Sequence, residues 1–255
     1  MADAVVRWAL VVAYEGTAYY GFQYQAVGPS VQGARERALT KLTREDMRIS
    51  AASRTDSGAH ALGQVVSFTT GARLPASAWV YGLNSLLPND VAVQAAYQVP
   101  LSFHPRRDAT SREYRYTIHN TPVPNPLERR TSLWVRQPLD VPAMAEASRT
   151  LAGTWDFSAF AGPLGQRTPQ RTIFKADVVR EGPRVYFDIV GNAFLPQMVR
   201  RCGGALLQVG LGRLSVGAFQ ELLASARPQS AGLALPAYGL CLMKVNYPSF
   251  PPGMD

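Results

Sequence analysis

The order of the secondary-structure signals in the first half of the chain constrains its fold most. Segments rich in β-branched and aromatic residues alternate there with segments whose apolar residues recur at helical spacing. The resulting order, β-α-β-β-α-β, is that of the split, ferredoxin-like arrangement. The predicted strands are residues 5–14, 47–52, 63–69 and 91–99, and the predicted helices are residues 30–42, with Ser30 as N-cap, and 76–87.

The second half broadly repeats this order without visible sequence repetition. A break is expected around residues 101–108, and an exposed loop with three prolines around residues 121–130. We therefore predict an α+β protein of two ferredoxin-like, RRM-like halves, residues 1–104 and 105–255, that share a largely antiparallel sheet. The strands predicted for the second half are residues 111–119, 172–180, 185–190 and 238–245, and the helices are residues 142–151, 194–209 and 215–226.

The charge of the chain indicates a nucleic-acid partner. The formal net charge is +8, and only Lys41, Lys175 and Lys244 among the 26 basic residues are lysines. Arginine matches phosphate oxygens with two donors and stacks on bases. A GC-rich genome would explain the preference for arginine over lysine, but it would not explain the excess of positive charge.

Composition and spacing argue against several other classes. The longest apolar run, residues 8–14, is far shorter than a membrane span, and only a short apolar segment lies between Asp3 and Arg7, so we expect neither a membrane helix nor a secretory signal. Cys202 and Cys241 are expected to be reduced in a cytoplasmic protein. The three histidines lack zinc-ligand spacing, so we expect no metal.

Devices that bind nucleotide phosphates are also missing. The sequence has no P-loop motif. The glycines at 203, 204, 210 and 212 follow a helical segment instead of a strand, which favours helix packing over a dinucleotide site. A kinase, an ATP-driven ligase and a Rossmann-type methyltransferase are therefore disfavoured.

Residues 51–61 form a tight turn that carries Asp56, with Arg54 two residues upstream. A carboxylate on such a turn can be displayed to a substrate as a nucleophile or base. Asp-Ser-Gly is also ordinary turn chemistry, in which Asp bonds its own backbone. The turn alone is compatible with both interpretations.

Two further segments place polar side chains in apolar surroundings. The strand around Tyr114 puts Arg112, Tyr114 and Tyr116 on one face, either as core residues or as a platform for a flipped base. Arg200 and Arg201 lie in an otherwise apolar helix and point about 100° apart. Either one of them turns inward toward a carboxylate, or both are solvated.

Several spaced blocks together resemble one family. Residues 53–61, Ser-Arg-Thr-Asp-Ser-Gly-Ala-His-Ala, are similar to the Gly-Arg-Thr-Asp-Ala-Gly-Val-His-Ala motif of the tRNA pseudouridine synthase A family, and the resemblance runs nearly end to end. Ser53, Ser57, Ala59 and the pair Pro196-Gln197 depart from the family pattern, which puts substrate range in question. The other matching blocks are residues 14–23, 30–33, 112–116, 151–160, 194–200, 235–240 and 247–248.

The resemblance implies a pseudouridine synthase fold and the isomerisation of uridine to pseudouridine at positions 38, 39 and 40 of the tRNA anticodon stem-loop. It implies Asp56 as the nucleophile, with attack at ribose C1′ or uracil C6 left open, and Arg200 as its ionic partner. Tyr114 would stack on the uracil and is a candidate to take the C5 proton. Arg54 would fill the gap left by the flipped nucleotide. No cofactor or metal is implied.

The resemblance also implies a cytoplasmic homodimer. Contacts with the tRNA backbone are expected from Arg106, Arg107, Arg129, Arg130 and Arg167. Two alternatives remain at this point. One is a non-catalytic RNA-binding or chaperone protein on the same scaffold, and the other is a pseudouridine synthase that acts on a different RNA.

Overall fold

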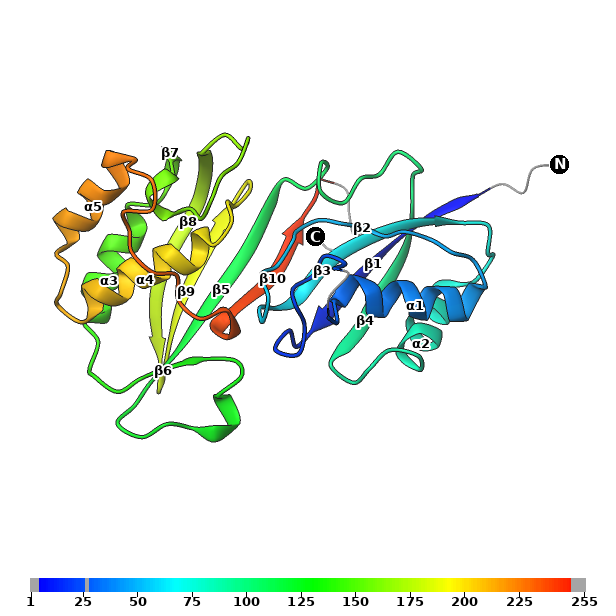
Figure 1. Ribbon diagram of the computed structural model, residues 1–255, viewed down its shortest axis with the longest axis horizontal. Helices are drawn as coiled ribbons and strands as arrows, with labels where there is room; N and C mark the ends of the chain where they lie inside the picture. The colour runs from blue at the N-terminus through cyan, green and yellow to red at the C-terminus, as the bar shows by residue number, and fades with distance from the viewer. Residues whose placement is uncertain (1–4, 26–27, 249–255) are drawn as a thin grey trace. The chain divides into compact units, whose positions relative to one another are not determined.

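The computed structural model describes residues 5–25 and 28–248, which form two compact units (Figure 1). The first unit comprises the residues up to Thr110 together with those from Leu242 onward, and the second comprises Ser111–Cys241. The halves expected from the sequence met at residue 104 and kept the last strand in the second half. The units differ from those halves in that the residues from Leu242 onward group with the first unit.

The first unit has the expected β-α-β-β-α-β order. Its sheet runs β4-β1-β3-β10, β2 pairs with β3, and the pairs β1–β3, β1–β4 and β2–β3 are antiparallel. Helix α2 packs on β4 and contacts α1. The elements are β1 (Val6–Tyr14), α1 (Val31–Thr43), β2 (Ser50–Ala51), β3 (His60–Thr70), α2 (Ala76–Asn84), β4 (Val91–Val99) and, from Leu242 onward, β10 (Leu240–Asn246).

Aromatic packing and side-chain caps fix the helices of this unit. Trp79 of α2 is fully buried, with its ring centroid 5.7 Å from that of Trp8 and 5.1 Å from that of Phe68. Ser30 caps α1 as predicted, because its Oγ accepts a hydrogen bond from the Gly33 N–H at 3.2 Å. The predicted cap and order are therefore confirmed.

The strand predicted at residues 47–52 is wrong in its length, since only Ser50 and Ala51 pair with β3. Ile49 directs its backbone N–H to Glu36 Oε1 of α1 at 3.2 Å instead of to a neighbouring strand. The Ala52 N–H still donates to the Val65 carbonyl of β3 at 2.9 Å, but the pairing does not extend back to Ile49.

The second unit is also α+β. Its sheet runs β5-β9-β8-β7 with antiparallel pairs, and β6 pairs with β5 in parallel. Helix α3 lies against β8 and contacts α4 and α5. The elements are β5 (Ser111–Asn120), β6 (Leu133–Val135), α3 (Val141–Arg149), β7 (Gly153–Asp156), β8 (Gln170–Glu181), β9 (Arg184–Gly191), α4 (Met198–Gly210) and α5 (Val216–Ser225).

Helix α4 begins four residues later than predicted, at Met198 instead of residue 194. Gln197 has left-handed backbone angles (φ 60°), so a helix cannot run through it and α4 begins after it. Phe194 lies before the helix and packs on Tyr114 of β5. The prediction that the glycines serve helix packing is confirmed at Gly204, where an added Cβ would lie 2.6 Å from the Leu233 carbonyl oxygen. The short strands β6 and β7 were not predicted.

Glu128 ties the exposed loop after β5 to β9. Its carboxylate accepts hydrogen bonds from Arg184 at 2.7 and 3.2 Å, and its Oε2 lies 3.2 Å from His119 Nδ1. The hydrogen bond from Arg184 is the main reason that the pKa of Glu128 falls below its ordinary 4.5, and charge attraction to Arg184 and His119 lowers it further. The contacts therefore hold the ionised form of this carboxyl.

This pKa predicts an acid-dependent loss of stability. A carboxyl whose pKa is lower in the folded chain stabilises the fold above its unfolded pKa, and that stabilisation disappears as the pH falls through the folded pKa. We expect Glu128→Gln to flatten the fall in unfolding free energy between about pH 5 and 3. Urea unfolding across that range measures it, with the exposed Glu146→Gln in α3 as control. Equal slopes for wild type and Glu128→Gln would contradict the prediction.

Candidate active site

Asp56 lies on the loop between β2 and β3, and backbone hydrogen bonds hold this loop. The Thr55 carbonyl accepts from the Phe22 N–H at 3.2 Å, and the Asp56 carbonyl accepts from the Ala59 N–H at 3.1 Å. The Gly58 N–H donates to the Tyr19 carbonyl at 3.2 Å. The side chain of Asp56 is half-buried. Main-chain contacts therefore hold the loop that presents Asp56.

The segment that follows β1 supports this loop from beneath. Tyr14 and Thr55 are both buried, and their hydroxyl oxygens lie 2.8 Å apart. The Gly16 N–H donates to His60 Nδ1 at 2.9 Å, and a Cβ at Gly16 would collide with the Ala59 carbonyl oxygen. Only glycine permits this approach of two backbones. The long-range packing of residues 14–22 therefore determines where Asp56 stands.

Tyr19 connects the same loop to the start of β4. Its hydroxyl donates to Asp90 Oδ1 at 2.5 Å, and its carbonyl accepts from the Ser57 hydroxyl at 3.2 Å as well as from Gly58. Burial raises the pKa of Tyr19 well above its ordinary 10, and the hydrogen bond and the charge of Asp90 add to the rise. Tyr19 thus stays neutral and acts as a fixed donor.

Arg54 is exposed next to a cavity of about 290 Å³ in the first unit. Its neighbour Ser53 is anchored by the fully buried Gln64, through hydrogen bonds of 3.2 and 2.8 Å to the Ser53 N–H and carbonyl. His104 lines the same cavity, and its Nδ1 accepts from the backbone N–H of Arg106 at 3.2 Å. The other ring nitrogen of His104 is then a donor, so the cavity wall carries positive and donor groups.

Arg35 of α1 is a buried cation that the sequence did not reveal. It is 2% exposed, and its guanidinium carbon lies 5.5 Å from the ring centroid of Tyr14 and 5.2 Å from that of Phe22. None of its guanidinium nitrogens has a hydrogen-bond partner among the described residues. Burial lowers the pKa of Arg35 to about 10. The guanidinium of Arg35 thus packs on Tyr14 and Phe22, the two residues that are hydrogen-bonded to Thr55.

The second unit carries Tyr114 on β5. Arg112, Tyr114 and Tyr116 are buried on one face of the strand, as the alternation predicted. The Tyr114 ring meets Phe194 edge to face at 5.0 Å, and Arg112 Nη1 donates to the Asn192 carbonyl at 2.6 Å. Tyr114 is therefore a rigidly held aromatic ring and not a mobile surface side chain.

Arg200 and Arg201 lie in the first turn of α4, and both are half-buried. Arg200 Nε donates to the Leu235 carbonyl at 2.5 Å. Arg201 donates to the Gly232 carbonyl at 2.6 Å and to Gln197 Oε1 at 3.2 and 3.3 Å. Neither arginine is simply solvated, but the acceptors named here are carbonyl and amide oxygens, so an inward turn toward a carboxylate stays a prediction.

The predicted site residues are thus distributed over both units. Asp56 and Arg54 belong to the first, and Tyr114 and Arg200 belong to the second. The candidates for RNA-backbone contacts are all exposed; they are Arg106, Arg107, Arg129, Arg130 and Arg167. In the described part of the chain, no group of three His, Cys, Asp or Glu side chains could hold a metal, and no helix is long and apolar enough to cross a membrane.

Known proteins resemble this chain over most of its length. The profile of the family described as tRNA pseudouridine synthase matches residues 10–108 and 147–248. A protein from Moorella thermoacetica named tRNA pseudouridine synthase A is 45% identical over 93% of this chain and 98% of its own length. Proteins of the same name from Geobacter sp. (strain M21) and Neisseria gonorrhoeae are each 43% identical, over 94% and 95% of this chain and 98% and 92% of their own lengths.

These matches define the class of the protein first: it is an enzyme, an isomerase, and its α+β units have the pseudouridine synthase fold. The chain belongs to the tRNA pseudouridine synthase family. A chain of a solved Cbf5-Nop10-Gar1 complex also aligns, with a TM-score of 0.34 and 14% identity over 78% of this chain and 45% of that one. That similarity is too low to add to the assignment.

Proposed function

We propose that this enzyme isomerises uridine to pseudouridine at positions 38, 39 and 40 in the anticodon stem-loop of tRNA. The observation that carries the proposal is the Asp56 loop, which hydrogen bonds to the carbonyls of Thr55, Asp56 and Tyr19 hold in place. A nucleophile is most effective when its position is fixed before the substrate arrives. The relatives named tRNA pseudouridine synthase A supply the substrate class.

In this mechanism Asp56 is the nucleophile, and attack at ribose C1′ or at uracil C6 is equally compatible with its position on the loop. The C1′–N1 bond breaks, the uracil turns, C5 bonds to C1′, and the bond that Asp56 formed to C1′ or C6 breaks again. The proton leaves C5, and N1 gains one. No electron is lost or gained overall, so the reaction needs no redox partner.

We assign the supporting roles to three residues. Tyr114 stacks on the uracil and is the candidate to accept the C5 proton, and its fixed ring suits the first task. Arg200 offsets the negative charge of the Asp56 carboxylate. Arg54, exposed beside the cavity, fills the space that the flipped nucleotide leaves, which recovers part of the few kcal/mol that flipping costs.

The test is a single-turnover reaction with an unmodified tRNA transcript that carries uridines at 38, 39 and 40, without added metal or cofactor. Pseudouridine is mapped by carbodiimide labelling and primer extension. We expect primer-extension stops at those positions, and none in a matched transcript with cytidines there. Binding without any pseudouridine would favour the non-catalytic RNA-binding alternative, and modification only of a structured non-tRNA transcript would favour a different RNA substrate.

The cytoplasmic location and the homodimeric state stay predictions. Sedimentation of the purified protein at several concentrations tests the second of them. A species of twice the 27.8 kDa chain mass is expected.

A further inference from the structure

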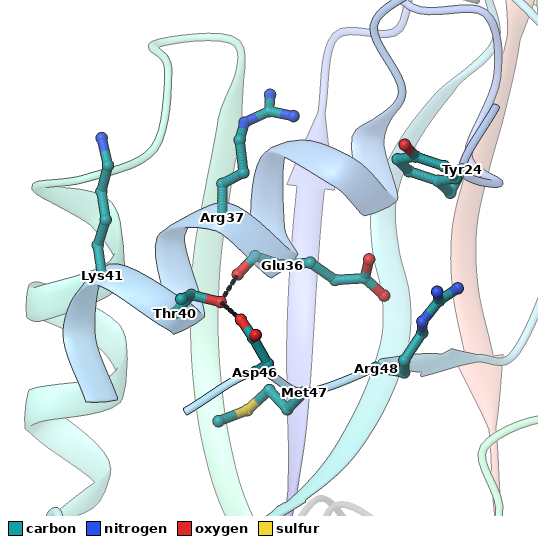
Figure 2. A pocket seen from close by; sticks show the side chains of 8 residues that line it. All are labelled: Tyr24, Glu36, Arg37, Thr40, Lys41, Asp46, Met47 and Arg48. Atoms are coloured by element: carbon teal, nitrogen blue, oxygen red, sulfur yellow. Dashed lines mark hydrogen bonds between the residues drawn. The ribbon is translucent and has the colours of Figure 1, made fainter. Parts of the chain in front are cut away.

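A second hollow in the first unit lies beside the candidate site. It is a groove of about 760 Å³ between α1 and the segment that leads to β2 (Figure 2). Side chains from both segments and the ring of Tyr24 line it. We refer to it as the α1 groove.

Three cations and two acids line the α1 groove, so its lining carries an excess of positive charge. The side chains of Arg37, Lys41 and Arg48 are exposed. None of these side chains has a hydrogen bond or ion pair with another described residue. Arg37 and Lys41 are four residues apart on α1, where like charges oppose helix formation. The fold therefore tolerates a local repulsion that an anionic partner would relieve.

The two acids of the α1 groove are already occupied. Glu36 Oε1 accepts hydrogen bonds from Gln32 Nε2 at 2.8 Å and from the Ile49 N–H at 3.2 Å. The Thr40 hydroxyl lies 3.4 Å from Asp46 Oδ1, a contact drawn in Figure 2, where Arg37 and Lys41 project from α1 away from Asp46. The acids connect the two segments that form the groove, and the cations remain available to a ligand.

The α1 groove has neighbours in the chain among the residues that line the cavity beside Arg54. That cavity is lined by Gln32 of α1 and by Phe22 and Gln23. Tyr24, which follows Gln23 in the chain, lines the groove. The Tyr24 N–H donates to Gln32 Oε1 at 3.0 Å, so one side chain of α1 joins the two hollows. The Tyr24 side chain is 54% exposed and presents an aromatic ring to the solvent.

We propose that the α1 groove binds tRNA outside the reacting nucleotide, with Arg37, Lys41 and Arg48 on phosphates and Tyr24 against a base or ribose. The inference rests on the proposed function and extends it. From Arg37 to Lys41, α1 rises about 6 Å, which matches roughly two phosphate steps of a stacked strand. Alternating cations and one aromatic ring are what a nucleic-acid strand requires.

The test compares two triple variants that lose the same charge. One is Arg37→Gln/Lys41→Gln/Arg48→Gln, and the control neutralises three exposed cations of the second unit, Lys175, Arg213 and Arg227. We expect the groove variant to bind full-length tRNA at least tenfold more weakly, and its plot of log K against log salt to be shallower by roughly two to three. The control should change little. The single-turnover rate at saturating tRNA should stay within twofold of wild type for the control.

If the groove variant and the control have the same tRNA affinity and salt slope, the proposal is overturned. The α1 groove would then be a solvated surface without a role in tRNA binding. Thermal melts establish that both variants are folded. Tyr24→Leu is compared with Tyr81→Leu, which removes a tyrosine that is 76% exposed on α2. We expect Tyr24→Leu to bind tRNA more weakly than wild type and Tyr81→Leu to bind it as wild type does. Equal tRNA affinities of the two variants would contradict the proposed contact of Tyr24 with a base or ribose. If the proposed function fails, wild type forms no pseudouridine, whereas failure of the groove leaves wild-type modification intact and affects only the binding comparison.

Discussion

Replacement of Asp56 by Asn is expected to abolish pseudouridine formation, with a loss on the order of 10⁴-fold or more in the single-turnover rate. Asn has nearly the same shape as Asp but cannot form the covalent intermediate. The main-chain contacts of Thr55, Asp56 and Tyr19 do not involve the replaced atoms, so the loop should keep its position. Rapid-quench assays with tRNA in the presence of excess enzyme measure the loss.

Ser57→Ala is the matched control for this variant. Ser57 is the next residue on the loop, is exposed, and uses its hydroxyl to donate to the Tyr19 carbonyl. Because the Gly58 N–H donates to the same carbonyl, the loop should survive and activity should fall only a few-fold. The tRNA affinity of Asp56→Asn should match wild type. An Asp56→Asn enzyme with more than about a hundredth of the wild-type rate would remove Asp56 from the role of nucleophile.

Replacement of Arg35 by Met is expected to make the protein more stable and less active. Burial without a hydrogen-bond partner among the described residues disfavours the charged form of Arg35, and this lowers its pKa from the ordinary 12.5 to about 10. An apolar side chain of similar length should therefore raise the unfolding free energy by about 1–3 kcal/mol, partly offset by lost contact with the rings of Tyr14 and Phe22.

The pH dependence of this effect has a defined sign. Arg35 has a lower pKa in the folded chain than in the unfolded one, so the unfolded chain keeps the proton to higher pH. Wild-type stability should rise relative to Arg35→Met as the pH increases through about 10, and the difference between the two should narrow. Urea unfolding at pH 7 to 10.5 measures it. A Met variant less stable than wild type at pH 7 would contradict the assignment of a costly buried charge.

The activity loss follows from what the guanidinium contacts. The Tyr14 hydroxyl is hydrogen-bonded to the Thr55 hydroxyl, and the backbone N–H of Phe22 donates to the Thr55 carbonyl. The rings of Tyr14 and Phe22 both pack on Arg35. Small displacements of a catalytic group cost about ten- to a hundredfold in rate, so we expect kcat to fall in that range with little change in KM. Leu39→Met, a buried apolar exchange on the same helix, is the control and should leave the rate unchanged.

Much of the fold could be predicted because local signals and packing agree. Ser30 is a good cap and the residues after it have helical spacing, so α1 begins where the sequence indicates. The alternation around Tyr114 likewise predicts which side chains of β5 are buried. The exceptions are not visible in the local pattern: Ile49 bonds to Glu36 of α1 outside the two-residue ladder of β2, and the left-handed backbone of Gln197 delays a helix.

The same reasoning explains what could be predicted of the site. The turn chemistry around Asp56 and the resemblance of residues 53–61 to a family motif identified the candidate nucleophile. The bond between Tyr14 and Thr55 spans 41 residues, and no local pattern indicates it. Arg35 lies within the buried stripe of α1, where helical periodicity favours an apolar residue. Its burial depends on the packing of the whole unit, so no local signal could have revealed it.

The return of the chain to its first unit has a consequence for synthesis on the ribosome. The strand β10 is translated only after all of Ser111–Cys241, yet from Leu242 onward it belongs to the unit that carries Asp56, where the Met243 carbonyl lies against Gly63 of β3. While the second unit is still emerging, β3 lacks one of its hydrogen-bonded neighbours, and an unpaired strand can associate with other chains. A frameshift near the distal end of the reading frame would thus damage the unit that was translated first.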